Sequence, residues 1–328
     1  MENVILAGVD GSETGTDALD WAINEARSRS WPLRLVGAYS PHRTPGSFKA
    51  GGAALSEADI AGVLETATGR AEAAGVMATS HALPGDADTI LLEQSRSVAL
   101  VVVGTHGRGG IAGRLLGTVP YGLAANSASP VVIVPPKAGR TVPDSLPVHN
   151  TSTSLRAIEV SDYGPAARDG GNLQLNGHIV VGVDALGTEN PAVWAAADAA
   201  QRHDKPFTLL SVSTLRAADD GWMLAGFDMD HYYRDFAEAL HSAAVTISEH
   251  FPGLDIDWRL FEGKAAHILV QATDSADLVA LGTRGYGGFR GLLLGSVSQA
   301  VLHHGESPMM IVPALDAATS PHHWLTGR

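Results

Sequence analysis

The chain has 328 residues, of which 45% are hydrophobic and 17% charged, which is enough apolar material for more than one core. Its formal net charge of −13 argues against nucleic acid or an anionic membrane as the main partner, and the absence of cysteine excludes disulfides, thiolate metal ligands and cysteine nucleophiles. Because no apolar stretch approaches the roughly 20 residues of a membrane helix, and the N-terminus lacks a signal-peptide pattern, we expect a cytoplasmic protein.

Strand-like and helix-like patterns alternate in the first half of the chain. An apolar run at 4–9 predicts a strand, and apolar residues at helical spacing predict a helix over 16–28. The alternation continues as strand 33–39, helix 56–74, strand 77–83, helix 87–95, strand 100–103, helix 119–126 and strand 131–134.

The second half repeats the same order of elements. It is expected to contain strand 179–183, helix 191–202, strand 207–212, helix 230–250, strand 254–261, helix 265–272, strand 278–281, helix 297–303 and strand 309–312. We therefore expect two tandem domains at 1–137 and 178–315, followed by a tail at 316–328. The segment 138–177 between them has the composition of a long linker, in which the short apolar piece 155–160 could pair with a sheet edge.

This alternation predicts parallel, doubly wound sheets of the flavodoxin or Rossmann type, with helices on both faces. Ligands of such sheets bind beyond the carboxyl ends of the strands, where the strand order reverses. Asp10 and Asp184 each follow the first strand of a half, so we expect both carboxylates at a ligand site. A role in a turn or a helix cap is the simpler alternative.

A glycine-rich motif follows the fourth strand of each half: Gly-x-x-Gly, nine residues, then a glycine and a hydroxyl residue that opens a helix. Backbone approaches a phosphate closely only where side chains are absent, and a helix N-terminus offers unpaired N–H groups to an anion. Each copy predicts a nucleotide phosphate cradle, although tight helix–strand packing would also explain the glycines. The residues are Gly104, Gly107, Gly117 and Thr118 in the first copy, and Gly282, Gly285, Gly295 and Ser296 in the second.

Cationic side chains lie in both glycine loops. His106 and Arg284 occupy the same position of the two loops, and Arg108 follows in the first. These side chains could neutralise phosphate charge or simply be solvated. No spacing of His, Asp and Glu along the chain predicts a metal site.

Together these features resemble the universal stress protein family in its tandem two-domain form. The resemblance rests on Gly-Val-Asp after the first strand, on the glycine motif, and on the endings Ser129–Pro135 and Ser307–Pro313, and it covers about 3–136 and 178–314. It implies five-stranded sheets of order 3-2-1-4-5 with the fifth strand at a subunit or domain interface, hence a homodimer or an intramolecular pseudo-dimer. It also implies binding of ATP, or a related adenine nucleotide, with Mg²⁺.

The resemblance also implies roles for individual residues. Asp10 and Asp184 would contact the nucleoside or its metal, and the backbone at Ala38 and Val212 would read the adenine edge, while the glycine motifs would contact ribose and phosphate. The expected sites are completed by Gly11, Ser12, His106, Arg108 and Val119 in the first half, and by Arg284, Val297 and Ser298 in the second.

Each half departs from the family pattern. Pro120 stands where the second half has the hydroxyl of Ser298, and Ala185–Leu186 stands where the first half has Gly11–Ser12. These differences remove one hydroxyl from the first site and add bulk to the second. We still expect both sites to bind nucleotide.

The expected function is that of an ATP-binding regulatory protein of the stress-response type, with little or no hydrolysis, because the chain has no Walker lysine and no Walker-B-type acid pair. A slow ATPase or an ATP-dependent transferase is one alternative, but the transferase would require a Ser-Gly-Gly-x-Asp-Ser-like loop, which the sequence lacks. A phospho-receiver domain, which has a similar sheet, is another alternative. It would need an acidic pair after the first strand and a lysine after the last, and Pro135-Pro136-Lys137 supports the latter poorly. A degenerate protein that binds no nucleotide and acts through its surfaces is a further alternative, supported by Pro120 and Leu186.

Overall fold

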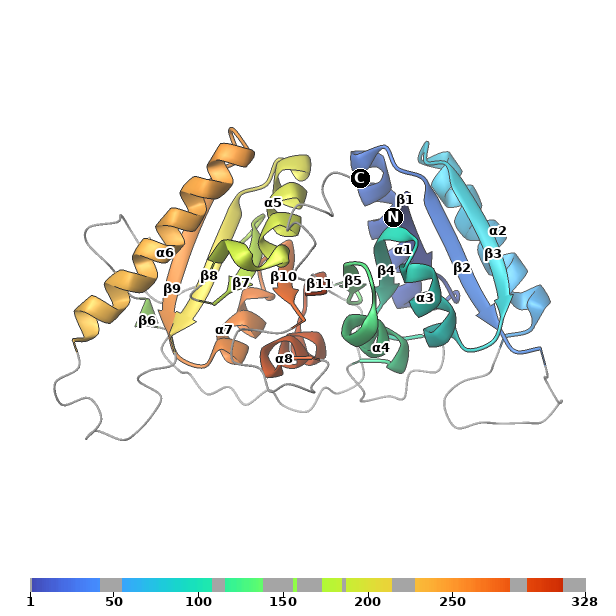
Figure 1. Cartoon of the computed structure of the whole chain (residues 1–328). Coiled ribbons are helices and arrows are strands. Elements are labelled where there is room, and N and C mark those ends of the chain that lie inside the picture. The colour runs from blue at the N-terminus through green and yellow to red at the C-terminus, as the bar shows by residue number, and fades with distance from the viewer. Residues whose placement is uncertain are drawn as a thin grey trace. The chain divides into compact units, whose positions relative to one another are not determined.

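The computed structural model describes residues 2–41, 55–107, 116–137, 156–157, 173–184, 187–213, 228–283 and 294–314 (Figure 1). The chain divides into two compact units. The first comprises Met1–Asn150, Pro308–Pro313 and Thr326–Arg328, and the second comprises Thr151–Ser307 and Ala314–Leu325. The domain limits expected from the sequence stay predictions, because most of the linker and the tail lies outside the described residues.

The first unit is an α/β sheet covered by helices. The strands β3-β2-β1-β4-β5 are all parallel, which confirms the expected 3-2-1-4-5 order. A strand from the end of the chain, β11, joins this sheet antiparallel to β5, with Met310 opposite Val132. The elements of this unit are β1 (Glu2–Gly8), α1 (Glu13–Arg29), β2 (Leu33–Tyr39), α2 (Glu57–Ala73), β3 (Ala78–Pro84), α3 (Ala87–Ser95), β4 (Val98–Gly104), α4 (Thr118–Asn126), β5 (Val131–Val134) and β11 (Met309–Val312).

Two neighbouring residues of β2 show how the faces of this sheet are covered. A Cβ on Gly37 would lie 2.4 Å from Ile60 of α2, whereas Ala38 lines a cavity together with Ile90 and Leu91 of α3. Successive side chains of a strand point to opposite faces, so α2 and α3 cover opposite faces of the sheet. Every residue of β5 is buried, as is usual for a strand of a sheet covered on both sides.

Local capping sets where the first two helices begin. The Ser12 hydroxyl accepts the N–H of Gly15 at 3.0 Å, so α1 begins at Glu13 and not at the expected residue 16. Ser56 and Asp59 form a capping box at the start of α2, close to the expected start. Hydrophobic spacing predicts the middle of a helix better than its ends, because the residues that cap the ends are polar and do not follow that spacing.

The second unit repeats the architecture. The strands β10-β7-β8-β9 are parallel, and β6 adds antiparallel to β9 with Ala157 opposite Phe261. For residues 156–157, the described part of the 155–160 piece, this confirms the expected pairing with a sheet edge. The 3₁₀ turn η1 has no counterpart among the expected elements. The elements are β6 (Arg156–Ala157), β7 (Ile179–Val183), η1 (Gly187–Glu189), α5 (Pro191–His203), β8 (Phe207–Ser213), α6 (Met229–His250), β9 (Ile256–Glu262), α7 (Ala265–Ala272), β10 (Leu278–Gly282) and α8 (Ser296–His304).

The described helices give no support to a membrane span. Within the described ranges, none of them combines the length and the apolar character needed to cross a bilayer.

His178, the residue before β7, contacts the neighbouring strand β8 through its ring. Its Nδ1 lies 2.8 Å from the hydroxyl oxygen of Thr208, a fully buried residue of β8. Burial lowers the pKa of His178 below its ordinary value of 6.5, and the Arg259 cation lowers it further, against the opposing charges of Asp257, Asp255 and Asp277.

We expect acid to destabilise the second unit through this residue. As the pH falls below 6.5, the ordinary value, the unfolded chain binds a proton that folded His178 accepts less readily, so the free energy of unfolding decreases. In the variant His178→Gln this titration is lost, and the thermal midpoint should change less between about pH 7.5 and about pH 5.5 than in the wild type. Equal pH dependence of the two midpoints would contradict the assignment.

Candidate functional site

The turn between β1 and α1 holds the first expected ligand, Asp10. Its Oδ1 accepts the N–H of Ser12 at 2.9 Å, and the turn passes through Gly11 at φ +74°. Glycine is needed there because this φ is left-handed and because a Cβ would lie 2.9 Å from Cγ2 of Val63. The carboxylate of Asp10 is thereby held at the carboxyl end of β1, where doubly wound sheets bind ligands.

The loop after β4 is hydrogen-bonded to the start of α1. The Thr14 hydroxyl donates to the carbonyl oxygen of His106 at 2.5 Å, and the Ser12 hydroxyl donates to the same oxygen at 3.4 Å. The His106 ring is also fixed locally, with its Nδ1 2.9 Å from the Thr105 hydroxyl oxygen. These contacts join two loops that are far apart in the sequence.

The glycines of the first motif do not all serve the same purpose. A Cβ on Gly104 would lie 2.6 Å from the carbonyl carbon of Thr14, and a Cβ on Gly107 would lie 2.7 Å from Oδ2 of Asp10. At Gly117 the nearest atom would be 3.3 Å away, so its neighbours need move only slightly. The first two glycines therefore permit close packing between chain segments, which is the alternative that the sequence leaves open.

Between these two loops lies a cavity of about 110 Å³, which we call the β1–β4 slot. Its polar lining side chains are Asp10 and His106. Its apolar lining comes from Val9, Val36, Ala38, Ala87, Ile90, Leu91, Val103, Val119 and Pro120. Of the residues expected from the sequence, the slot brings together Asp10, Ala38, Gly104, His106, Gly107 and Val119.

The helix α4 begins beside the slot without a side-chain cap. Its N-cap is Gly117, whose own N–H donates to the carbonyl of Thr105 at 2.8 Å. The N–H groups of Thr118 and Val119 have no acceptor within the helix, and Pro120 has no N–H. The first turn of α4 therefore offers two N–H groups to an anion, one fewer than it would with a non-proline residue at position 120.

The second half reproduces this loop geometry in part. The N–H of Gly295, the N-cap of α8, donates to the carbonyl of Thr283 at 2.8 Å, as its counterpart does in the first half. Ser298 is buried, and its hydroxyl donates to the carbonyl of Gly282 at 2.9 Å. The Ser298 hydroxyl, which we expected to bind nucleotide, thus connects α8 to the end of β10.

The remaining expected residues of the second half lie near the carboxyl ends of three neighbouring strands or at the start of α8. Asp184 follows β7 directly, while Val212 lies in β8 and Gly282 in β10, the two strands that pair with β7. Ser296 and Val297 form the start of α8. Three expected residues lie outside the described ranges: Arg108, Arg284 and Gly285.

Sequence reasoning missed Thr14 and the contribution of α3 to the slot. Thr14 was detectable in part, as a second hydroxyl residue shortly after the capping Ser12. For Ala87, Ile90 and Leu91 the sequence carries no signal beyond an apolar helix face, because the fold decides which cavity that face lines.

The family model for the universal stress protein family matches residues 1–135 and 176–313. The chain belongs to the universal stress protein family. A universal stress protein of Mycobacterium tuberculosis is 28% identical over 319 residues, covering 94% of this chain and 95% of the relative, and one of Mycobacterium bovis is 26% identical over 330 residues, covering 94% of each.

Solved structures of the family share the fold. The crystal structure of a universal stress protein from Archaeoglobus fulgidus matches with a TM-score of 0.58 and 17% identity, covering 95% of this chain and 96% of that one. A putative universal stress protein from Pseudomonas aeruginosa matches with a TM-score of 0.60 and 15% identity, covering 95% and 93%. The tandem α/β architecture is therefore that of the family.

The packing of Gly104 leads to a stability prediction. Gly104→Ala should lower the free energy of unfolding by about 1–3 kcal/mol, because the new methyl group meets the Thr14 backbone. Gly122→Ala is the matched control: its Cβ meets nothing within 4 Å in the middle of α4, so stability should rise by about 0.5–1 kcal/mol. Urea denaturation measures both, and a Gly104→Ala protein as stable as the wild type would refute the packing role.

Proposed function

We propose that this universal stress protein binds an adenine nucleotide in the β1–β4 slot and acts through that binding in a stress response. The observation that carries the proposal is an apolar cavity at the carboxyl ends of β1 and β4, with Asp10 in its lining and the uncapped start of α4 beside it. This is the place where doubly wound sheets bind their ligands. Membership of the universal stress protein family supports the stress-response role.

The slot, at about 110 Å³, would hold the purine of an adenine nucleotide, and the start of α4 beside it would hold the phosphates. The purine would lie against Ala38, Leu91 and Val103, whose side chains line the apolar part of the slot. The phosphates would accept the N–H groups of Thr118 and Val119, where the helix dipole favours negative charge.

Asp10 would accept a ribose hydroxyl or bind Mg²⁺ together with the phosphates of ATP. Among the described residues there is no group of three or more His, Asp or Glu side chains that could hold a metal ion. The proposal therefore has Mg²⁺ arriving with the nucleotide, as is usual for phosphate-bound magnesium.

We propose a matching site in the second half, at Asp184, Val212 and the start of α8. The loop of this half keeps the Gly295–Thr283 hydrogen bond of its counterpart, which supports the same phosphate geometry. The bond from Ser298 to Gly282 supports the alternative that this site is degenerate, since the hydroxyl already donates its proton to the protein.

The proposal is one of binding with little or no hydrolysis. The support is that the chain has no Walker lysine and no Walker-B-type acid pair. A slow ATPase or transferase is the alternative, and product analysis separates it from binding alone.

We further propose that the two repeats form a pseudo-dimer through their final strands. The support is the antiparallel pairing of β11, the last strand of the second repeat, with β5, the last strand of the first. Both strands are fully buried, so neither is an open apolar edge.

Calorimetry with Mg·ATP and mass spectrometry of nucleotide released from the purified chain test the binding proposal. We expect an adenine nucleotide at about two per chain if both halves bind and about one if only the first does. Gly117→Val should weaken binding by at least about tenfold at the first site, because its methyl groups occupy the approach to the N–H groups of α4. Gly122→Val, in the same helix with open space around its Cβ, should bind like the wild type.

Two other results would argue against binding without turnover. No released nucleotide and no heat on adding Mg·ATP would refute the proposal in favour of a degenerate protein. Conversion of added ATP to ADP or to an adenylated product would favour the enzyme alternatives.

A further inference from the structure

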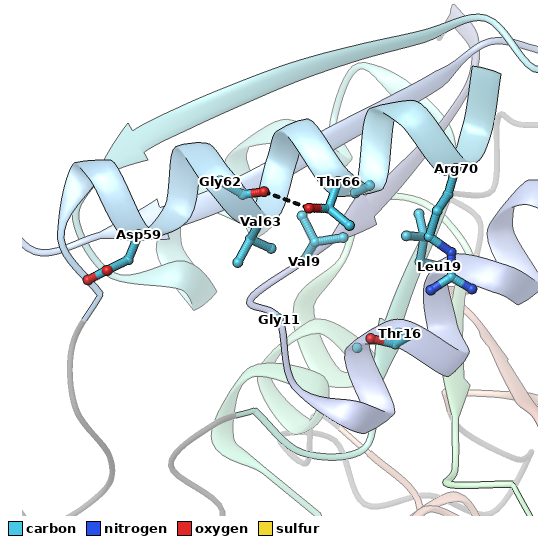
Figure 2. A pocket seen from close by; sticks show the side chains of 11 residues that line it. Val9, Gly11, Thr16, Leu19, Asp59, Gly62, Val63, Thr66 and Arg70 are labelled. Atoms are coloured by element: carbon cyan, nitrogen blue, oxygen red, sulfur yellow. Dashed lines mark hydrogen bonds between the residues drawn. The ribbon is translucent and has the colours of Figure 1, made fainter. Parts of the chain in front are cut away.

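A second cavity of the first unit, about 440 Å³ in volume, lies between α1 and α2 (Figure 2). We call it the α1–α2 groove. Val9, Leu19 and Ala67 line it and are themselves at most 6% exposed, so its deepest part is apolar. Its volume is within the range of small-molecule sites, about 300–1,000 Å³.

The groove is distinct from the β1–β4 slot. The two lie on either side of the β1–α1 turn, and both include Val9 and Gly15 in their lining. On the groove side, Gly11 packs against Val63 of α2, whereas on the slot side Asp10 faces the glycine loop. No part of the proposed nucleotide site requires the groove.

Most polar groups of the groove bond within their own helix or its capping residues. The Thr16 hydroxyl donates to the carbonyl of Ser12, and the Thr66 hydroxyl donates to the carbonyl of Gly62, as Figure 2 shows for the latter. Asp59, at one end of the groove, accepts from the backbone and hydroxyl of Ser56 in the capping box. None of these groups is directed to a ligand by the structure.

Arg70 differs from these groups. It lies at the other end of the groove from Asp59, and within the described part of the chain it makes one ion pair, to Asp20 of α1. Its side chain is 42% exposed, and a guanidinium carries five N–H donors, so it can hold a second carboxylate beside Asp20. Arg70 is not the sole cation beside Asp20, because the Lys137 ammonium lies 3.3 Å from the Asp20 carboxylate and is shared with Asp17 at 3.6 Å.

A glycine in α2, Gly62, leaves the groove open to a ligand. Gly62 lines it, and a Cβ on Gly62 would meet no atom within 4 Å. A glycine in a helix interior costs stability without a packing reason, and here the missing side chain leaves the groove open.

We propose that the α1–α2 groove binds a small amphipathic monocarboxylate, with its apolar body on Val9, Leu19 and Val63 and its carboxylate on Arg70. A single guanidinium already shared with Asp20 suits one carboxylate and not a polyphosphate. An apolar body suits the buried floor. The ligand class is therefore different from that proposed for the slot.

The test uses decanoate as the probe, with decan-1-ol and decyltrimethylammonium as its uncharged and cationic counterparts. Each is titrated into the ¹⁵N-labelled full chain while amide shifts are followed by NMR. We expect saturable shifts at Val9, Gly62 and Val63, and binding of decanoate about tenfold tighter than that of either counterpart. Shifts confined to other parts of the chain, or equal affinity for the three probes, would overturn the proposal.

Two variants on α2 form a matched pair. Gly62→Leu places its side chain in the groove and should abolish decanoate binding. Gly69→Leu, on the same helix, also meets nothing within 4 Å and does not line the groove, so it should bind decanoate like the wild type. Unchanged decanoate binding by Gly62→Leu would overturn the proposal.

Arg70→Gln tests the carboxylate contact directly, and it does so even if Gly62→Leu fails to fold. It should reduce the affinity for decanoate about tenfold, to that of decan-1-ol, while leaving decan-1-ol binding unchanged. Equal loss for both probes would overturn the assigned role of Arg70. Because Gly117→Val should leave decanoate binding intact, failure of this proposal and failure of the nucleotide proposal can be told apart.

Discussion

The close approach of Gly104 to Thr14 is the contact on which the site of the first unit depends. The end of β4 lies against the start of α1 with no room for a side chain between them, and the Thr14 hydroxyl bonds to the carbonyl of His106 from the same side. This contact brings the glycine loop to Asp10 and leaves the β1–β4 slot between them. A displacement of either loop would change the shape of the slot, because protein interiors have few voids to absorb it.

The two repeats share this scaffold but have diverged in how the final helix is joined to the sheet. In the second repeat the buried Ser298 hydroxyl bonds to the end of β10, whereas Pro120 of the first repeat has no hydroxyl to do the same. Both repeats keep the bond from the N-cap N–H to a loop carbonyl, and in the first repeat α1 also contacts the loop through the Thr14 hydroxyl. A duplicated domain can therefore keep one fold while its two proposed ligand sites differ in their donors.

The β1–α1 turn has a cavity on each side. Val9 is part of the lining of both the slot and the groove, and Gly11 presses on Val63 of α2. Since the turn is short and held by the Asp10–Ser12 hydrogen bond, a change in its backbone would alter both cavities.

The sequence by itself determined the order of the elements, the tandem repeat and the position of Asp10 at a strand end, because these follow from hydrophobic period and from local residue order. The 3-2-1-4-5 order of the first sheet was implied by the resemblance to the family, and the strand pairings confirm it. Only the tertiary structure decided that Gly104 and Gly107 pack against Thr14 and Asp10, and that α3 lines the slot. Those contacts join segments distant in the sequence. A glycine that meets another backbone and a glycine that leaves space for a ligand look identical until the chain is folded.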